Sequence, residues 1–264
     1  MLRKLIKYDL KWSLKIVSVY YIIGFITAVI GRLFDFLPES TFFNVVGGFI
    51  KGASISLTIT GIINCIIRTW VRMITNMYKD ESYLTHTIPT SRRNHFYSKV
   101  ITSIIVLTVS FIVLLINVLI LYLSNNSINF IKNLMNTFEN LYDGSTTVFI
   151  ILVFMLLLVE IIYIVLCGFF AIIYGYSCEN GKLGKSFLIG FIGYGILNTV
   201  SLFIILFGTI FSSDLYHLIF KQAELTDFNF FLVLLVISLI LYLIYSVLLF
   251  VLSCRKLDKG VNIE

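Results

Sequence analysis

Few side chains in this sequence have the type and spacing that catalysis or metal binding requires. The three histidines, His86, His95 and His217, lie in separate stretches, and no HExxH pattern occurs, so a zinc protease is not predicted. The four cysteines have no paired spacing and lie within or beside apolar runs, where cysteine acts as a small hydrophobic residue. We therefore expect no metal centre, disulfide framework or cofactor site in this chain.

Two glycine-containing motifs resemble ligand-binding loops but fit a structural role better. Gly181-Lys182-Leu183-Gly184-Lys185-Ser186 has two residues between its glycines, whereas a nucleotide-binding phosphate loop has four and follows a strand. Ile192-Gly193-Tyr194-Gly195 is similar to a potassium-channel filter, but it lies inside a continuous apolar run with no re-entrant helix before it. The first motif is explained as a basic loop, and the second as close helix packing through small residues.

Glu160 is the one acidic residue deep within an apolar run, where a charged side chain is costly. Either it lines a cavity as a substrate contact or protonatable switch, or it bonds to a neighbouring helix and serves assembly. Asn64, Asn117 and Asn198 pose a weaker form of the same choice, with interhelical hydrogen bonds the commoner outcome. We take Glu160, Asn64 and Asn198 as candidates for a substrate path.

The elements that must position these residues are long apolar runs. The sequence of 264 residues is 59% apolar and 13% charged, whereas a soluble domain carries about 25% charged residues. A helix that crosses about 30 Å of hydrocarbon needs roughly 20 mostly apolar residues. Six runs approach that length: 16–34, 49–71, 100–124, 147–177, 187–211 and 229–253. The sequence therefore predicts an all-α polytopic membrane protein, with one transmembrane domain over residues 1–264.

The distribution of Lys and Arg predicts the orientation of the six spans. With the N-terminus inside the cell, 16 of the 20 Lys and Arg residues lie on the inner side. The other four, Arg32, Lys51, Lys132 and Lys221, lie on the outer side. Because cytoplasmic loops carry an excess of positive charge, both termini are expected to be cytoplasmic.

Shorter amphipathic segments flank the spans. Residues 1–15 place four lysines at helical spacing opposite apolar residues, with Asp9 as an exception, and this predicts a helix at the cytoplasmic interface. A cleaved signal peptide is disfavoured because no small-x-small site follows. Residues 130–141 and 215–220 have apolar residues at helical spacing, which predicts outer elements that either seal the bundle or gate it.

The longest cytoplasmic segment between spans, residues 68–99, can be read as a solvated basic loop or as a docking element. It mixes acidic residues with aromatic and aliphatic ones over residues 80–97, which a plain solvated loop does not require. Thr90-Ser91, directly after Pro89, offers an N-cap for a helix running toward Lys99. These features favour a docking element with a short helix that presents one face to a soluble partner.

Three features of the chain resemble the membrane subunit of ABC-2 exporters, in the group found in Gram-positive bacteria. They are the opening Met1-Leu2-Arg3-Lys4-Leu5-Ile6-Lys7-Tyr8-Asp9-Leu10-Lys11, the stretch from Asp80 to Arg93 closed by Ser98-Lys99, and the six-span layout. The middle stretch has the family's order of acidic residues, Tyr-Leu, Ile-Pro and Ser-Arg. The topology match covers the whole chain, and the motif match covers a small part of it.

This resemblance implies a half-transporter. Two six-span subunits, identical or homologous, would form the path, and two separate ATPase subunits would bind ATP and Mg. Residues 80–99 would dock in the ATPase as the main coupling element, and residues 179–186 would be the second contact. The residues that the resemblance assigns to ATPase coupling are Asp80, Glu81, Tyr83, Leu84, Pro89, Ser91, Arg92, Arg93, Lys182 and Lys185.

We therefore expect a permease subunit of the bacterial cell membrane, without enzymatic activity of its own and without a nucleic acid partner. A path lined mainly by Leu, Ile, Phe and Tyr suits an amphipathic or hydrophobic cargo, first of all a membrane-active peptide, with a role in antimicrobial resistance. Drug or sodium efflux within the same family, and a polytopic immunity or sensor protein without transport, are the alternatives.

Overall fold

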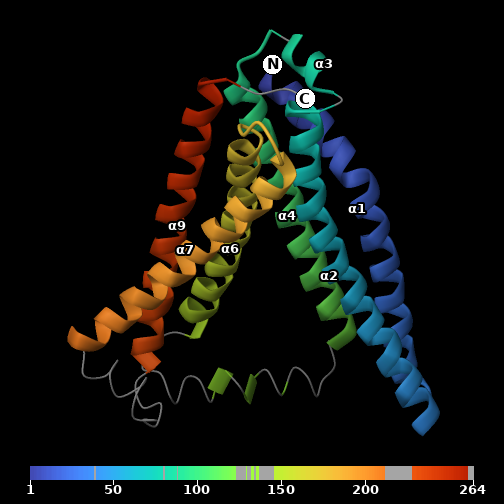
Figure 1. Cartoon of the computed structure of the whole chain (residues 1–264). Helices are drawn as coiled ribbons and strands as arrows, with labels where there is room; N and C mark the ends of the chain where they lie inside the picture. The colour runs from blue at the N-terminus through green and yellow to red at the C-terminus, as the bar shows by residue number, and fades with distance from the viewer. Residues whose placement is uncertain are drawn as a thin grey trace. The chain divides into compact units, whose positions relative to one another are not determined.

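A computed structural model of the chain describes residues 1–38, 40–79, 81–87, 89–122, 129, 132–133, 135–136, 146–211 and 228–260 (Figure 1). Its elements are α1 Leu2–Leu33, η1 Phe34–Phe36, α2 Thr41–Met77, α3 Ser82–Thr87, α4 Arg92–Tyr122, α6 Thr146–Gly175, α7 Lys182–Phe211 and α9 Phe228–Asp258. Six of the helices are long and apolar enough to cross a membrane, which confirms the predicted number. The predicted outer elements at 130–141 and 215–220 fall wholly or largely outside the described residues.

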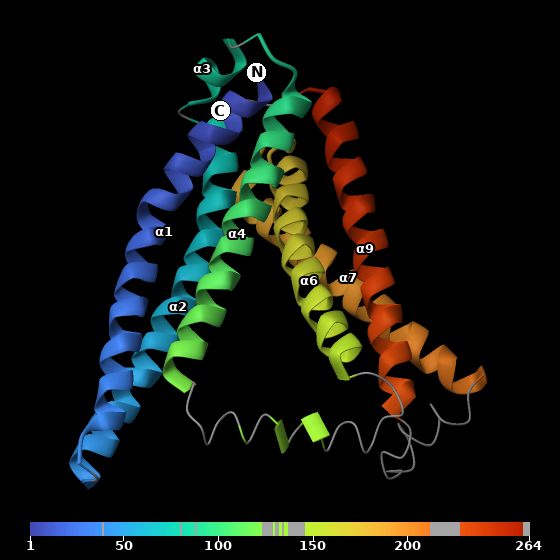
Figure 2. The same cartoon turned by 180° about the vertical axis from the view of Figure 1, so that it is seen from behind.

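The long helices extend beyond the apolar runs, mostly at the ends predicted to be cytoplasmic. α2 has 37 residues, and at ~1.5 Å per residue it is longer than the ~30 Å of hydrocarbon requires. α1 runs without a break from Leu2, so the predicted interfacial helix over 1–15 and the first span form one element. Its ribbon bends in the N-terminal part (Figure 2). Where residues 1–15 lie relative to the membrane stays a prediction.

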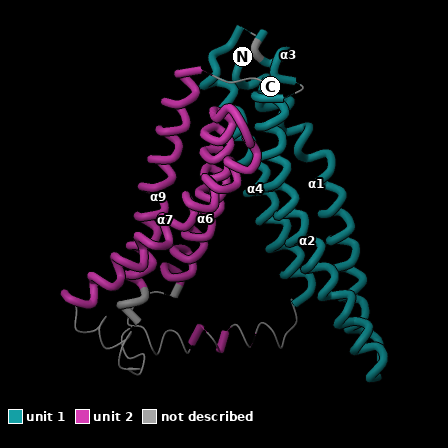
Figure 3. Tube along the Cα trace, viewed as in Figure 1, with its two compact units in different colours: residues 1–128, 263–264 teal, residues 129–262 magenta. Residues whose placement is uncertain are grey.

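The chain forms two compact units (Figure 3). Unit 1, within residues 1–128, contains α1, α2, α3 and α4, and unit 2, within residues 129–262, contains α6, α7 and α9. Each unit is built on three long helices. The single transmembrane domain expected from the sequence stays a prediction.

Unit 1 has a core of small and polar residues between α1, α2 and α4. The Ser54 hydroxyl donates to the Gly24 carbonyl at 2.8 Å, and Asn117 Nδ2 donates to Thr58 Oγ1 at 2.8 Å. Apolar side chains gain little by leaving lipid for a protein interior, so close packing and interhelical hydrogen bonds hold such bundles. Asn117 confirms the prediction of an interhelical hydrogen bond.

An ion cluster lies at the end of unit 1 where the C-terminus of α1 meets the start of α2. Asp35 pairs with Arg32, at 3.0 Å between Nη1 and Oδ2, and also with Lys51. Two of the four basic residues predicted to be on the outer side therefore share one carboxylate.

Unit 2 is built on α6, which contacts both α7 and α9. The closest approach is at Gly175, where an added Cβ would lie 2.5 Å from both the Cα and the backbone nitrogen of Ser186. Farther along α7, a Cβ at Gly193 would lie 3.4 Å from Cys167 Sγ, which confirms that Gly193 serves helix packing. Gly195 meets no atom within 4 Å, so it takes no part in that contact.

Four tyrosines join the three helices of unit 2. The ring of Tyr163 lies 6.1 Å from that of Tyr194, 5.3 Å from Tyr242 and 5.7 Å from Tyr245, measured between centroids. The hydroxyls of Tyr163 and Tyr245 both donate to the Gly193 carbonyl, at 3.3 and 3.2 Å. Aromatic packing of this kind adds stability beyond burial alone, and each of these two hydroxyls has a partner inside the bundle.

Contacts within each unit agree with an up-and-down order of the helices. Asp9 of α1, Arg72 of α2 and Lys99 of α4 meet, so the start of α1, the end of α2 and the start of α4 share one end of unit 1. In unit 2, Lys256 of α9 lies 5.5 Å above the Tyr174 ring of α6, so the C-terminal ends of these helices are together. The basic residues thus gather as the sequence predicted, and the cytoplasmic assignment itself remains a prediction.

Candidate functional site

The connection between α2 and α4 is shorter and more helical than the 68–99 segment suggested. α2 continues to Met77, α3 is a separate short helix, and α4 begins at Arg92. Ser91 caps α4 as predicted, because its hydroxyl accepts from the Asn94 backbone nitrogen at 3.3 Å. The capped helix is the third span itself and not a separate docking helix. The short helix on this connection is instead α3.

α3 presents two large apolar side chains to solvent. Tyr83 is 66% exposed and Leu84 is 72% exposed, whereas Ser82 and Thr85 of the same helix are buried. Thr85 closes the first turn of this helix, since its backbone nitrogen and hydroxyl both donate to the Glu81 carbonyl at 2.9 Å. The Glu81 backbone nitrogen in turn donates to the Thr75 carbonyl of α2 at 3.2 Å, which braces α3 against α2. An exposed aromatic and aliphatic pair on a braced helix has the character of a protein-docking surface.

Asp9 of α1 is buried and binds three side chains from α2 and α4. It is 5% exposed and accepts from Lys99 Nζ at 2.5 Å, Ser98 Oγ at 2.9 Å and Arg72 Nε at 3.3 Å. A buried carboxylate is tolerated only when it is paired and hydrogen-bonded, and both conditions are met here. Asp9 therefore ties α1 to α2 and α4.

The same set of bonds continues from Asp9 to the start of α3. Arg72 Nη1 donates to both carboxylate oxygens of Glu81, at 2.8 and 3.0 Å. Asn76 also connects Glu81 with Lys99, because its Nδ2 donates to Glu81 at 2.7 Å and its Oδ1 accepts from Lys99 at 3.1 Å. We call this set the inner ion network; its members are Asp9, Arg72, Asn76, Glu81, Ser98 and Lys99.

The inner ion network runs from solvent into the helix bundle. The Glu81 side chain is 46% exposed, the Arg72 side chain 14% and the Lys99 side chain 7%. The Arg72 guanidinium also lies 5.0 Å from the centre of the Trp12 ring of α1. A displacement of α3 that pulls on Glu81 thus acts on Arg72, and through Arg72 on α1 and α4. The arrangement can transmit movement mechanically.

A cavity of about 10 Å³ borders this network and is lined by polar side chains that include Asp9, Thr69, Lys99 and Thr102. That volume suits one water molecule. The Thr102 hydroxyl is buried without a protein partner, which fits a water site. No room for an organic ligand exists at this point.

The other predicted coupling residues lie apart from the inner ion network. Pro89, Arg92 and Arg93 are exposed around the start of α4. Lys185 is exposed and Lys182 half-buried at the start of α7 in unit 2, after a loop in which Gly181 has a φ of +66°. Asp80 lies outside the described residues.

The three predicted path residues have separate surroundings. Glu160 is half-buried in α6 and lies within electrostatic range of the Tyr242 hydroxyl of α9. Asn64 and Asn198 each donate Nδ2 to a carbonyl one turn earlier in their own helix, Thr60 at 2.9 Å and Tyr194 at 3.2 Å. Within the described residues, neither side chain has a hydrogen bond to another helix, and the place of both residues in a substrate path stays a prediction.

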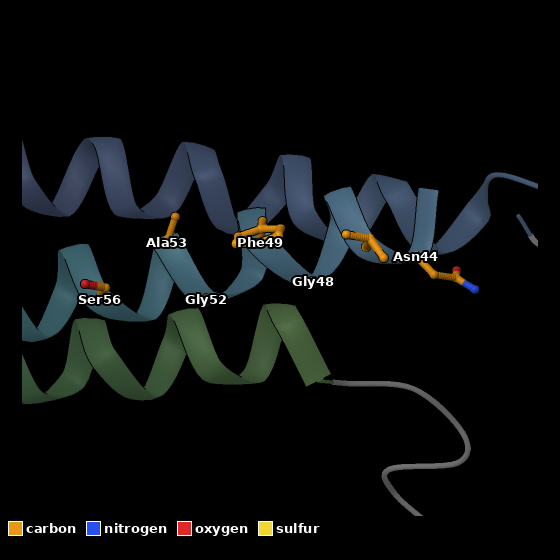
Figure 4. A pocket seen from close by; sticks show the side chains of 7 residues that line it. Asn44, Gly48, Phe49, Gly52, Ala53 and Ser56 are labelled. Carbon is orange, nitrogen blue, oxygen red and sulfur yellow. The ribbon is translucent and has the colours of Figure 1, made fainter. Parts of the chain in front are cut away.

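A shallow groove runs along the exposed side of α2 (Figure 4). It encloses about 560 Å³ and follows a row of small residues four apart, Gly48, Gly52 and Ser56, beside Phe49. A Cβ at Gly48 or Gly52 would meet no atom within 4 Å. No described side chain covers this row.

The residues that sequence reasoning missed are the buried ions. In the sequence, Asp9 is an exception to the amphipathic pattern of residues 1–15, Arg72 adds to the positive charge on the inner side, and Lys99 closes the stretch that resembles ABC-2 subunits; none of the three is predicted to be buried. One signal was present: a lone acid among five basic residues at the start of a span needs a cation partner if its face of the helix is buried.

Comparison of the chain with protein-family models, with curated proteins and with solved structures finds no match. The helices themselves establish the class. Six long apolar helices in two three-helix units, with polar bonds turned toward the helix contacts, make this chain an all-α polytopic membrane protein.

Proposed function

We propose that the chain is the membrane-spanning permease subunit of an ATP-driven exporter. A separate ATPase subunit, present in two copies, docks on α3, and a second permease copy or a homologous one completes the transporter. The resemblance to ABC-2 exporter subunits in residues 80–93 and in the six-span layout supports this proposal.

One observation carries the proposal: the exposed pair Tyr83 and Leu84 is joined to three long helices by the inner ion network. Glu81, directly before the α3 helix, is bonded to Arg72 of α2, and Arg72 is bonded to Asp9 of α1, which holds Lys99 of α4. A loop that only connects two spans needs no such bracing. A partner that moves α3 during ATP hydrolysis would move the inner ends of these helices as rigid bodies.

The cargo that we propose is an amphipathic or hydrophobic molecule, first of all a membrane-active peptide. Glu160 is the one acidic residue deep in the described spans, and the tyrosine cluster beside it offers rings and hydroxyls together. A sodium path would require more acidic ligands, since small hard cations bind several oxygen atoms. A lipophilic drug fits the same surroundings as a peptide.

The docking surface is tested by replacing both Tyr83 and Leu84 with Ala. Co-expressed with a candidate ATPase subunit from the same genome, the wild-type chain is expected to retain that ATPase through purification in mild detergent. Two truncated hot-spot residues cost about 2 kcal/mol each, so the double variant should bind the ATPase more than roughly a hundredfold less tightly. Cargo should then no longer stimulate ATP hydrolysis, and ATP hydrolysis should no longer drive transport.

The matched control is the replacement of Phe36 and Leu37 with Ala. This exposed aromatic and aliphatic pair follows α1 at the opposite end of unit 1, with 75% and 42% of each residue exposed. It should leave ATPase binding unchanged. Failure of the wild-type chain to retain any ATPase, or an equal loss in both double variants, would rule the proposal out.

A further inference from the structure

The N-terminal part of α1 carries a row of exposed lysines. Lys4, Lys7, Lys11 and Lys15 are spaced by three, four and four residues, so they share one face of the helix. All four are exposed, and none makes an ion pair with a described residue. The opposite face is the buried one, which contains Asp9. We call these four residues the α1 lysine row.

The α1 lysine row continues directly into the lipid-facing side of the same helix. Farther along the same face come Ile22 and Ile26, which are 59% and 50% exposed. In a membrane-spanning helix, exposed side chains of this kind contact acyl chains. A lipid that packs against these residues therefore has its headgroup beside the lysines.

The distances along the helix suit contact with headgroups. Lys15 directly precedes the apolar run, and Lys11 lies one turn farther out, about 6 Å along the axis. Lys7 lies about 12 Å out along the helix, in the part where the ribbon of α1 bends (Figure 2). The potential of a charged membrane surface acts over about 8–10 Å at physiological salt.

Among the residues that the structure describes, no acidic side chain neutralises the charge of this surface. The one acid among residues 1–15 is Asp9, and its carboxylate is occupied by Lys99, Arg72 and Ser98. Trp12 lies one turn from Lys15, and the Arg68 guanidinium carbon of α2 is 4.3 Å from the centre of its ring. Arg68 therefore adds a further positive charge near Lys15. Tryptophan prefers this interfacial depth in membranes.

We propose that the α1 lysine row binds the phosphate headgroups of anionic phospholipids in the leaflet at this end of the protein. Each lysine near a charged membrane surface contributes about a fivefold gain in affinity, and one headgroup can reach one or two of them. The expected preference for an anionic over a zwitterionic lipid at this site is therefore roughly five- to twenty-five-fold at low salt. This inference does not depend on the proposed export function.

Trp12 provides the readout, because the chain has only one other tryptophan. The indole nitrogen of Trp70 is buried without a hydrogen-bond partner, so Trp70→Phe is a mild change. It leaves Trp12 as the only tryptophan, which is excited at a wavelength that tyrosine does not absorb. The full chain with this substitution is reconstituted in phosphatidylcholine bilayers that contain a small fraction of brominated phosphatidylglycerol or brominated phosphatidylcholine. Bromine near the headgroup quenches tryptophan fluorescence. The quenching by brominated phosphatidylglycerol divided by the quenching by brominated phosphatidylcholine therefore gives the lipid preference at Trp12.

The parent protein should show the preference for phosphatidylglycerol, and 1 M salt should abolish most of it, because the screening length falls to about 3 Å. Replacing Lys7, Lys11 and Lys15 with Gln should bring the ratio close to one, and replacing the same three with Arg should preserve it. The charge-matched control replaces Arg255, Lys256 and Lys259 of unit 2 with Gln and should preserve it as well. Absence of a preference in the parent, insensitivity to salt, or an equal loss in the two Gln triples would overturn the proposal.

Discussion

Replacing Asp9 with Asn is expected to lower the free energy of unfolding of unit 1 by about 3–5 kcal/mol. The substitution preserves the shape of the side chain and a hydrogen bond to Ser98, but it removes the charge that faces Lys99 and Arg72. Lys99 is only 6% exposed, so water cannot replace the lost carboxylate unless α4 moves. The cost comes from the buried charge that is left behind, more than from the contact that is lost.

The unfolding of unit 1 can be followed through Cys65, which is 1% exposed in α2. With the other three cysteines replaced by Ser, a thiol-reactive dye reports only on this position during titration with SDS. The double variant with Asp9→Asn and Lys99→Met should regain part of the loss, because it removes the unpaired ammonium and keeps an apolar side chain of similar length.

Asp35 supplies a matched control, because it also binds one Arg and one Lys between α1 and α2. Its side chain is 34% exposed, against 7% for Asp9. Solvent-exposed ion pairs contribute at most about 1 kcal/mol, so Asp35→Asn should change the unfolding curve little. Equal losses for Asp9→Asn and Asp35→Asn would show that burial of the inner ion network is not what stabilises unit 1.

The spans could be predicted from the sequence because lipid imposes a simple requirement on composition. A helix that crosses hydrocarbon must be apolar over a known length, and this locates each span whatever its neighbours are. The ends could not be located in the same way. α1 begins at Leu2 and α4 at Arg92, well outside the apolar runs, because hydrogen bonding and caps such as Ser91 decide where a helix starts.

The inner ion network could not be predicted because it depends on how three helices are rotated. Asp9 and Lys99 are 90 residues apart, and their contact requires that α1 and α4 be neighbours with these two positions facing inward. Charge counting treats Arg72 and Lys99 as solvated residues on the inner side of the membrane. The structure places both in the interior of unit 1, where they hold helices together.

The segment between α2 and α4 could be predicted in part: its exposed apolar residues could, and the partners of Glu81 could not. The mixture of acidic and apolar residues predicts a docking surface in this segment, because apolar residues in a hydrophilic loop are unusual unless they are covered. Tyr83 and Leu84 are exposed, and their role in docking stays a prediction. The sequence grouped Glu81 with them as a partner contact. Its carboxylate is instead held by Arg72 and Asn76 of the same chain, so it links the surface to the helices.

Gly175→Ala is expected to destabilise unit 2 by about 3 kcal/mol or more, at the upper end of the cost of overpacking. An added Cβ would overlap Ser186 Oγ and lie 2.5 Å from the Ser186 Cα and backbone nitrogen. Side chains can rotate away from a clash, but a backbone cannot, so α6 and α7 must separate. For the same reason, adding Ser186→Gly should not restore stability, since two of the three close atoms remain.

Cys167 reports on this separation because it is 5% exposed in α6 and donates to the Gly190 carbonyl of α7 at 3.5 Å. In a variant with Cys167 as the only cysteine, Gly175→Ala should raise the rate of thiol labelling under native conditions and lower the SDS fraction needed for unfolding. Gly195→Ala, on the neighbouring helix α7, is the control, because an added Cβ there meets no atom within 4 Å. It should stay within about 1 kcal/mol of wild type, the usual effect of this substitution inside a helix. If Gly175→Ala behaved like Gly195→Ala, the close contact of α6 with α7 at Ser186 would be wrong.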